Sequence, residues 1–390
     1  MSAQPATRSA AVPPSADPFY GPVSRVPDPG IVIRSRRVSV VHETVARAWQ
    51  LVYSSTGSRG QSIAVSGTIL APTAAWRGPG RRPTLTYGVG VHGLGRDAAP
   101  SFQLTSGTEV EIEVIAQALR QGWMVLVTDG EGLGMPGPHT YGAGLPGGHT
   151  MLDIVRAASS VVPSTAGAPV LVWGYSEGGR CAAMAAELHP DYAPDLDLVA
   201  VAAGGVPSDL AVMAAALEDG PFAGLNLAVL VGLAHAHGDP ALLNVLTEEG
   251  REAATRAAEL DAAGLIVEYP QPLRAHTVRD TPWEDPVWRE LLAQERAGQR
   301  PPRVPTLVYH VEDDQLVPTE LGRQLAEDYR RLGASVDWYS VDADNHLSGV
   351  YVSSSQVVAW LADALREESV VGRCAPADRH PEGDSPSPAG

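Results

Sequence analysis

The stretch from Ala168 to Arg180 reads A-P-V-L-V-W-G-Y-S-E-G-G-R. An apolar run leads into the pattern Gly-X-Ser-X-Gly at 174–178, and a helix-forming segment follows it. This order is typical of a strand, a tight turn and a helix, with Ser176 at the tip of the turn. Glycines on both sides are needed because a Cβ would clash with neighbouring backbone in so sharp a turn. The sequence therefore predicts a serine hydroxyl raised above a sheet edge, beside the free N–H groups of a helix N-terminus.

The rest of the chain alternates short apolar runs with helical segments, which favours an α/β fold with a mostly parallel, doubly wound sheet. The predicted strands are Ser62–Ala71, Thr84–Val91, Trp123–Thr128, Pro169–Gly174, Leu198–Ala203, Thr306–His310 and Val336–Val341. The predicted helices are Glu109–Gln121, Met151–Val162, Glu177–Glu187, Glu320–Leu332 and Ser354–Glu367.

One long interval, residues 206–299, carries little strand signal and is rich in Ala and Leu, which predicts an inserted helical cap. The predicted core then consists of residues 30–205 and 300–370. The Pro-, Ser- and Ala-rich ends predict a flexible N-terminal arm at 1–29 and a disordered tail at 371–390.

Composition excludes several classes of protein. The formal net charge of −17 argues against nucleic-acid binding. The 28 basic residues are all arginine, so Schiff-base lysines and the lysine-containing phosphate loop are excluded. The two cysteines, Cys181 and Cys374, form neither a disulfide framework nor a zinc site, and we expect them to be unpaired.

No apolar run is long enough to span a membrane, so stable membrane insertion is not expected. The first residues lack a charged segment followed by an apolar one. The sequence as it stands predicts a cytoplasmic protein, or a secreted one if the chain is a mature form.

A nucleophilic serine needs a base and an orienting acid, which follow it in the order acid, then histidine, in hydrolases with this turn. After the strand at Thr306–His310 comes V-E-D-D-Q-L-V-P. Its acidic side chains lie where a parallel strand ends, at the same sheet edge as the serine. We choose Asp314 as the acid, ahead of Asp313 and then Glu312.

His346 is the expected base, because it lies in the predicted loop between the last strand and the last helix. An oxyanion site needs two N–H donors. The backbone of Glu177 is the expected first donor. The loops at Val91–Gly95 and Thr128–Gly132 are both candidates for the second, and the residues alone do not separate them.

Several motifs together resemble the secretory lipases related to lipase A of the yeast Candida antarctica. They are G-Y-S-E-G-G at 174–179, T-D-G-E-G-L-G at 128–134, G-P-F-A-G-L at 220–225, Y-H-X-X-X-D-X-X-V-P ending at Pro318, and N-H-L around His346. The resemblance implies an α/β-hydrolase with a helical cap over an acyl-binding tunnel. Carried over by position, it implies a triad of Ser176, Asp314 and His346, with the N–H of Asp129 as the second oxyanion donor.

The predicted function is therefore a serine hydrolase of carboxylic esters, a lipase or esterase, acting on a small acyl ester or lipid. It works through an acyl-enzyme and needs neither a cofactor nor a metal. Phe222, Leu227 and Leu230 of the cap are candidate substrate-binding residues. An acyltransferase or thioesterase of secondary metabolism would use the same triad. A peptidase and a catalytically silent binding protein are the remaining alternatives. Oligomeric state, natural acyl donor, chain length and interfacial activation are left open.

Overall fold

A nine-stranded sheet runs through the computed structural model, which describes residues 11–374. The strands lie in the order β1-β2-β3-β5-β4-β6-β7-β8-β9. β1, β2 and β3 pair antiparallel, β3 is antiparallel to β5, and the six strands from β5 to β9 in this order are parallel. Their bounds are β1 Val32–Val38, β2 Val45–Thr56, β3 Ser62–Pro72, β4 Thr84–Gly88, β5 Met124–Thr128, β6 Val170–Tyr175, β7 Leu198–Gly204, β8 Thr306–Val311 and β9 Val336–Val341.

Helices cover both faces of this sheet, so the prediction of a doubly wound α/β fold is confirmed. On one face α3, α4 and α10 pack around a core that includes Met151, and on the other α1, α2 and α11 pack around Trp173. The helices outside the insertion are α1 Pro100–Ser106, α2 Ile112–Arg120, α3 Gly144–Val161, α4 Glu177–Tyr192, α10 Thr319–Arg331 and α11 His346–Cys374.

All seven predicted strands and all five predicted helices have counterparts, but two strands were missed. β1 is a partly exposed edge strand whose arginines hide any alternation. β2 buries Gln50, Ser54 and Ser55 against the core, so its polar residues resembled a loop. The predicted strand end at Val89–Val91 is instead a loop after β4.

The N-terminal segment from residue 11 to 29 is packed, so the expectation of a flexible arm is wrong for these residues. Tyr20 is fully buried, and its hydroxyl lies 2.9 Å from Ser101 Oγ. The guanidinium of Arg34 donates to the carbonyl groups of Phe19 and Gly21. Buried aromatic side chains thus fix a proline-rich segment whose composition alone indicated disorder.

At the other end, α11 continues to Cys374, so the first residues of the expected tail are helical. Residues 1–10 of the expected arm and 375–390 of the expected tail lie outside the described residues.

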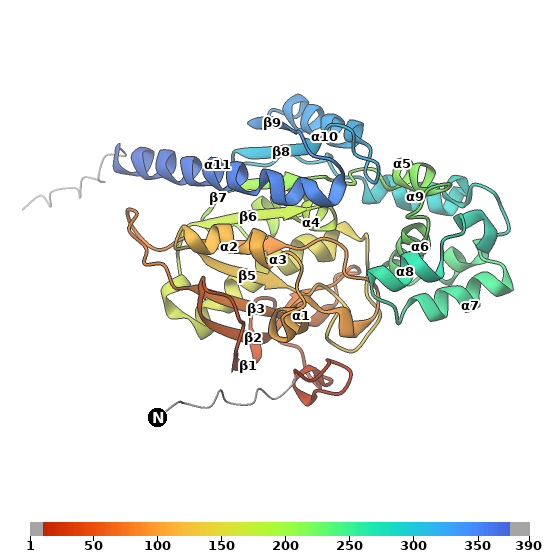
Figure 1. Ribbon diagram of the computed structural model, residues 1–390, viewed down its shortest axis with the longest axis horizontal. Helices are drawn as coiled ribbons and strands as arrows, with labels where there is room; N and C mark the ends of the chain where they lie inside the picture. Colours follow the sequence, from red (N-terminus) through yellow and green to blue (C-terminus); the bar gives the residue numbers. More distant parts are fainter. Residues whose placement is uncertain (1–10, 375–390) are drawn as a thin grey trace, which may run out of the picture.

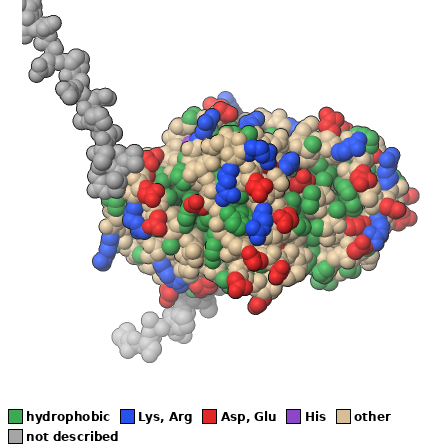
Figure 2. Space-filling model, turned by 90° about the horizontal axis from the view of Figure 1, so that it is seen from above, with side chains coloured by type: hydrophobic (Ala, Val, Ile, Leu, Met, Phe, Trp, Pro, Cys, Tyr) green, Lys and Arg blue, Asp and Glu red, His purple; other side chains and the backbone are tan. Residues whose placement is uncertain are grey.

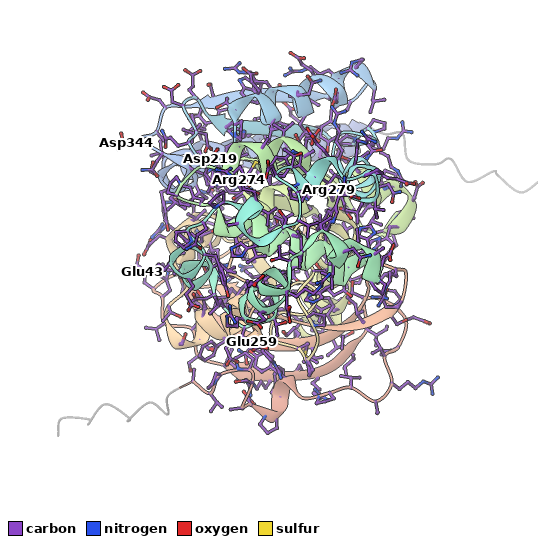
Figure 3. The ribbon with its side chains drawn as sticks, turned by 90° about the vertical axis from the view of Figure 1, so that its right-hand side faces the viewer. Glu43, Asp219, Glu259, Arg274, Arg279 and Asp344 are labelled. Atoms are coloured by element: carbon purple, nitrogen blue, oxygen red, sulfur yellow. The ribbon has the colours of Figure 1, made fainter. Side chains whose placement is uncertain are left out.

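Between β7 and β8 the chain forms a helical insertion at one end of the sheet, drawn from green to teal in Figure 1. Its helices are α5 Leu210–Leu217, α6 Gly224–His237, α7 Glu248–Ala257, α8 Ala262–Glu268 and α9 Pro286–Glu295. They share a core of their own, to which Leu94 and Tyr141 of the sheet loops contribute. Within the insertion, Arg274 pairs with Asp219, as Figure 3 shows from this side.

The surface carries acidic and basic side chains interspersed with small apolar patches on the face drawn in Figure 2. Over residues 11–374, none of the helices is long and apolar enough to cross a membrane.

Arg180 joins the insertion to the core from within the protein. It lies one turn into α4, is 1% exposed, and donates to the carbonyl groups of Gly142 and Pro207 at 2.9 and 3.3 Å. It also contacts Glu295 at both the carbonyl and the carboxylate, and His237 of α6 lies 2.9 Å from the other carboxylate oxygen. Pro207 and Glu295 stand where the chain enters and leaves the insertion. One guanidinium therefore hydrogen-bonds to both segments that connect the insertion to the core.

We predict that Arg180→Ala lowers the free energy of unfolding by about 3–5 kcal/mol, because it removes the donor to three carbonyl groups and the cation that pairs with the buried carboxylate of Glu295. Urea unfolding measures the change. Arg289→Ala, at an exposed arginine of α9, is the matched control and should stay within ~0.5 kcal/mol of wild type. A loss below ~1 kcal/mol in Arg180→Ala would contradict the assignment.

Candidate active site

Ser176 occupies a strained turn between β6 and α4. Its φ and ψ are 59° and −123°, and it is the one non-glycine residue with positive φ within residues 11–374. Such a conformation costs about 1–3 kcal/mol and persists only where the surroundings enforce it. Here a Cβ on Gly174 would lie 2.0 Å from the carbonyl oxygen of Gly178, and a Cβ on Gly178 would lie 1.9 Å from that of Gly88. The predicted strand, turn and helix are confirmed, and their close approach requires both glycines.

Asp314 and His346 come together beside this turn. Asp314 follows β8, His346 is the first residue of α11, and Oδ2 of the aspartate lies 2.6 Å from Nδ1 of the histidine. Oδ1 of Asp314 accepts from the N–H groups of Leu316 and Val317, both at 2.9 Å. Both oxygens of the Asp314 carboxylate therefore accept hydrogen bonds, which fix its orientation towards the imidazole of His346. His346 was expected in a loop and instead begins the helix.

The other acidic candidates do not take part in this pair. Asp313 and Glu312 are exposed, and Glu312 contacts Ser340 and Arg323. The geometry thus separates three neighbouring carboxylates that the sequence could only rank.

Burial by itself would raise the pKa of Asp314, but hydrogen bonds from His310 and His346 outweigh it and hold the pKa well below its usual range. The carboxylate is therefore ionised and able to stabilise an imidazolium. Nε2 of His346 is buried and has no hydrogen-bond partner within residues 11–374. It is free to accept a proton.

Tyr175, the residue before Ser176, places the histidine. Its hydroxyl donates to the carbonyl of His346 at 3.0 Å, and the two rings lie 4.9 Å apart. Gly205 leaves the room for this packing, since a Cβ there would lie 2.8 Å from the Tyr175 ring and 3.0 Å from Cε1 of His346. The motif Gly-X-Ser-X-Gly allows any residue at position 175, so Tyr175 was not predicted to belong to the site. Its bulky aromatic side chain was the signal that could have indicated this role.

The two expected oxyanion donors differ in whether their N–H groups are free to donate. Glu177 begins α4, whose first N–H groups receive no side-chain cap, which agrees with a donor there. The N–H of Asp129 instead donates to the carbonyl of Ser66 at 2.9 Å. It is therefore not free in this conformation, and the expectation of Asp129 as a ready donor needs correction. The reason is the antiparallel pairing of β3 with β5, which continues to this residue.

The carboxylate of Asp129 ties three segments together. It accepts from the N–H of Ser101 at 2.7 Å and from the hydroxyls of Ser66 and Ser101, both at 2.5 Å. Burial raises its pKa to about 6, against these hydrogen bonds. Because every contact is from a donor, the geometry is that of an ionised carboxylate. Asp129 thus joins β3, β5 and α1.

A small cavity of about 60 Å³ lies beside the turn. Its lining comes from the loop Gly88–His92, from the segments around Asp129 and Tyr141, and from Glu177 and Cys181 of α4. Cys181 is a free thiol whose pKa burial raises, so it is neutral. Nowhere in the described part of the chain do three or more His, Cys, Asp or Glu side chains form a metal-binding group.

The three predicted substrate-binding residues of the insertion do not line this cavity. Leu230 lines a separate apolar cavity of about 30 Å³ inside the insertion, together with Trp283 and Trp288. Leu227 is 1% exposed in the core of the insertion. Phe222 packs on the cluster that contains Leu316 and Val317.

The chain is similar to known proteins both in sequence and in fold. The family model "Secretory lipase" matches residues 98–372. A Mycobacterium tuberculosis protein named a probable inactive lipase is 30% identical, covering 90% of this chain and 82% of the relative. Lipase A of Arthroderma benhamiae is 27% identical over 95% of this chain and 83% of its own. The structure of Candida antarctica lipase A in its closed state is similar with a TM-score of 0.83 and 25% identity, over 92% of this chain and 88% of that one.

We predict that the stabilising effect of Asp314 depends on pH. The pKa is lowered by folding, so the ionised form stabilises the protein above the unfolded value of about 3.9, and this stabilisation is lost as the pH falls below it. The difference in unfolding free energy between wild type and Asp314→Asn should be constant from about pH 6 to 5 and shrink towards pH 3. Urea unfolding at each pH measures it. Asp313→Asn, at the exposed neighbour, should show no such trend, and a pH-independent difference at Asp314 would refute the assignment.

Proposed function

The chain belongs to the secretory lipase family, and on that premise we propose that it is a serine ester hydrolase with Ser176 as its nucleophile. One observation carries the proposal. The pair of Asp314 and His346, 2.6 Å apart, presents an unbonded Nε2 next to Tyr175, the residue that precedes the serine.

In the proposed acylation step, Nε2 of His346 takes the proton of Ser176 while Oγ forms a bond to the ester carbonyl carbon. The imidazolium is stabilised by the ionised Asp314, which also fixes the tautomer of the ring. Collapse of the tetrahedral intermediate breaks the bond to the alcohol oxygen, and His346 returns its proton to the leaving alcohol. The acyl group remains on Ser176.

In deacylation, His346 takes a proton from water as the water oxygen attacks the acyl carbon. The carboxylic acid leaves, and the proton returns to Ser176. The N–H of Glu177 stabilises the oxyanion in both halves. A second donor at Asp129 requires its hydrogen bond to Ser66 to open first. The loop Gly88–His92 is therefore the better source of that donor in this conformation.

The proposed substrates are acyl esters, including lipid esters, in keeping with the lipases among the relatives. One relative is named inactive, but this chain has a serine, an aspartate and a histidine at all three positions that the mechanism uses. Helices α5–α9 would act as a cap over the site, since Tyr141 of the cavity wall belongs to the core of the insertion.

We predict that the protein hydrolyses p-nitrophenyl esters and that Ser176→Ala lowers kcat by about 10⁶. A series from acetate to palmitate separates an esterase from a lipase by its optimum. Ser106→Ala, at an exposed serine of α1, is the matched control and should retain wild-type activity. A folded wild type that turns over none of these esters, or a Ser176→Ala variant that keeps the activity, would refute the proposal.

We also propose that the acyl chain extends into the insertion and reaches the cavity that Leu230 lines. Leu230→Phe should then shift the preferred acyl length towards shorter chains, because the ring fills this cavity. Leu233→Phe adds the same bulk to a buried position of α6 that does not line this cavity. Both variants should lose about 1–3 kcal/mol of stability from overpacking, but only the first should change the chain-length profile. Equal profiles for the two variants would show that Leu230 does not contact the acyl chain.

A further inference from the structure

A cluster of buried charged side chains lies next to the proposed oxyanion site, and the mechanism above does not use it. Glu109, Glu111 and His92 are 4%, 7% and 8% exposed. Glu111 accepts from the N–H of Gly90 at 2.7 Å and from the hydroxyl of Tyr87, and its own N–H donates to Glu109 at 3.0 Å. Glu109 in turn lies 2.9 Å from Nε2 of His92. We call these five residues the buried carboxylate cluster.

The protonation of His92 follows from its contacts. Nδ1 lies 2.8 Å from the carbonyl of Gly90 and Nε2 lies 2.9 Å from Glu109, so both ring nitrogens face acceptors and both carry protons. Burial would lower the pKa of His92, but Glu109 outweighs it and raises the pKa to about 9. Burial, together with Glu109, raises the pKa of Glu111 to about 7. The imidazolium of His92 therefore pairs with Glu109, while Glu111 receives the Tyr87 hydroxyl and the N–H of Gly90, so each carboxyl group has the donors that its burial requires.

Both ends of this network are attached to the loop Gly88–His92. The loop begins in backbone contact with α4, since a Cβ on Gly88 would lie 2.8 Å from the carbonyl oxygen of Gly178. The same loop lines the cavity beside Glu177. Within residues 11–374, the N–H groups of Val91 and His92 have no hydrogen-bond acceptor.

The segment that carries the two carboxylates also reaches the histidine side of the site. Val110, between Glu109 and Glu111, accepts a hydrogen bond at 2.9 Å from the hydroxyl of Tyr351. Tyr351 lies on α11, the helix that begins with His346. The ring of Tyr87 packs edge-on against Trp173 of β6, with centroids 5.0 Å apart. The cluster thus connects the loop to the elements that hold the serine and the base.

We propose that Glu109 and Glu111 are positioning residues, which act through His92 and Gly90 to hold the loop Gly88–His92 with its free N–H groups towards the oxyanion formed at Ser176. This inference rests on the proposed function. The carboxylates touch no reacting atom. They replace the hydrogen bonds that water would otherwise make to the loop, so the donors are fixed before the charge develops.

Glu111→Gln tests the proposal, because the amide keeps the size of the side chain and replaces one of two acceptors by a donor. We expect kcat for p-nitrophenyl butyrate to fall at least tenfold with KM unchanged, within the ~10²–10³ known for loss of an oxyanion donor. Inhibition by an alkyl boronic acid, which forms a tetrahedral anion on the serine, should weaken by a similar factor. Glu113→Gln, at an exposed carboxylate two residues further on, should leave all three values unchanged.

Two further experiments distinguish a loss of folding from a loss of function. Thermal unfolding establishes that Glu111→Gln is folded, and Tyr87→Phe, which keeps both carboxylates, should lower kcat in the same direction and serves if the first variant does not fold. Three results would overturn the inference in a folded Glu111→Gln variant: a wild-type kcat, a change in KM alone, or unchanged inhibition by the boronic acid. The proposed function would still stand in each case, provided that the wild type is active. An inactive wild type overturns both.

Discussion

The contact of three backbones at Gly88, Gly174 and Gly178 is the constraint on which the site depends. The ends of β4 and β6 approach the first turn of α4 so closely that a Cβ on Gly178 would come within 1.9 Å of the carbonyl oxygen of Gly88. This approach enforces the unusual φ of 59° at Ser176. It also places the loop after β4 against the helix N-terminus, where negative charge is stabilised. The strain of the turn is maintained by the packing of the whole parallel sheet.

Around this contact the protein buries charged groups and gives each of them a partner. Arg180 joins the two connections of the insertion, Asp314 receives two N–H groups and the imidazoles of His310 and His346, and Asp129 receives three donors. The buried carboxylate cluster follows the same rule. Each is costly to bury and stabilising only when complete. In the proposed mechanism, the donors and the base are therefore in place before substrate binds.

Much of this could be predicted from residue order. The motif around Ser176, the acidic loop after β8 and His346 before the last helix belong to local patterns that any parallel sheet brings to one edge. The seven predicted strands have counterparts because most of them are rich in Val and Leu and bounded by Gly or Pro. β1 and β2 were not predicted, because an edge strand with arginines and a strand with buried serines lack the clear apolar pattern of the other strands. Tyr20 was missed because composition reports only the average of a segment, whereas one aromatic side chain can fix it.

The sequence by itself determined the α/β class, the family resemblance, and Ser176 and His346 as the proposed nucleophile and base, because these depend on short patterns and their order. Only the tertiary structure decided which of the neighbouring carboxylates at 312–314 meets His346. It alone found that the N–H of Asp129 is already bonded to Ser66, and that Glu109 and Glu111 converge on the loop after β4. Such contacts join residues far apart in the chain. Their distances follow from how strands and helices pack, and no local pattern encodes them.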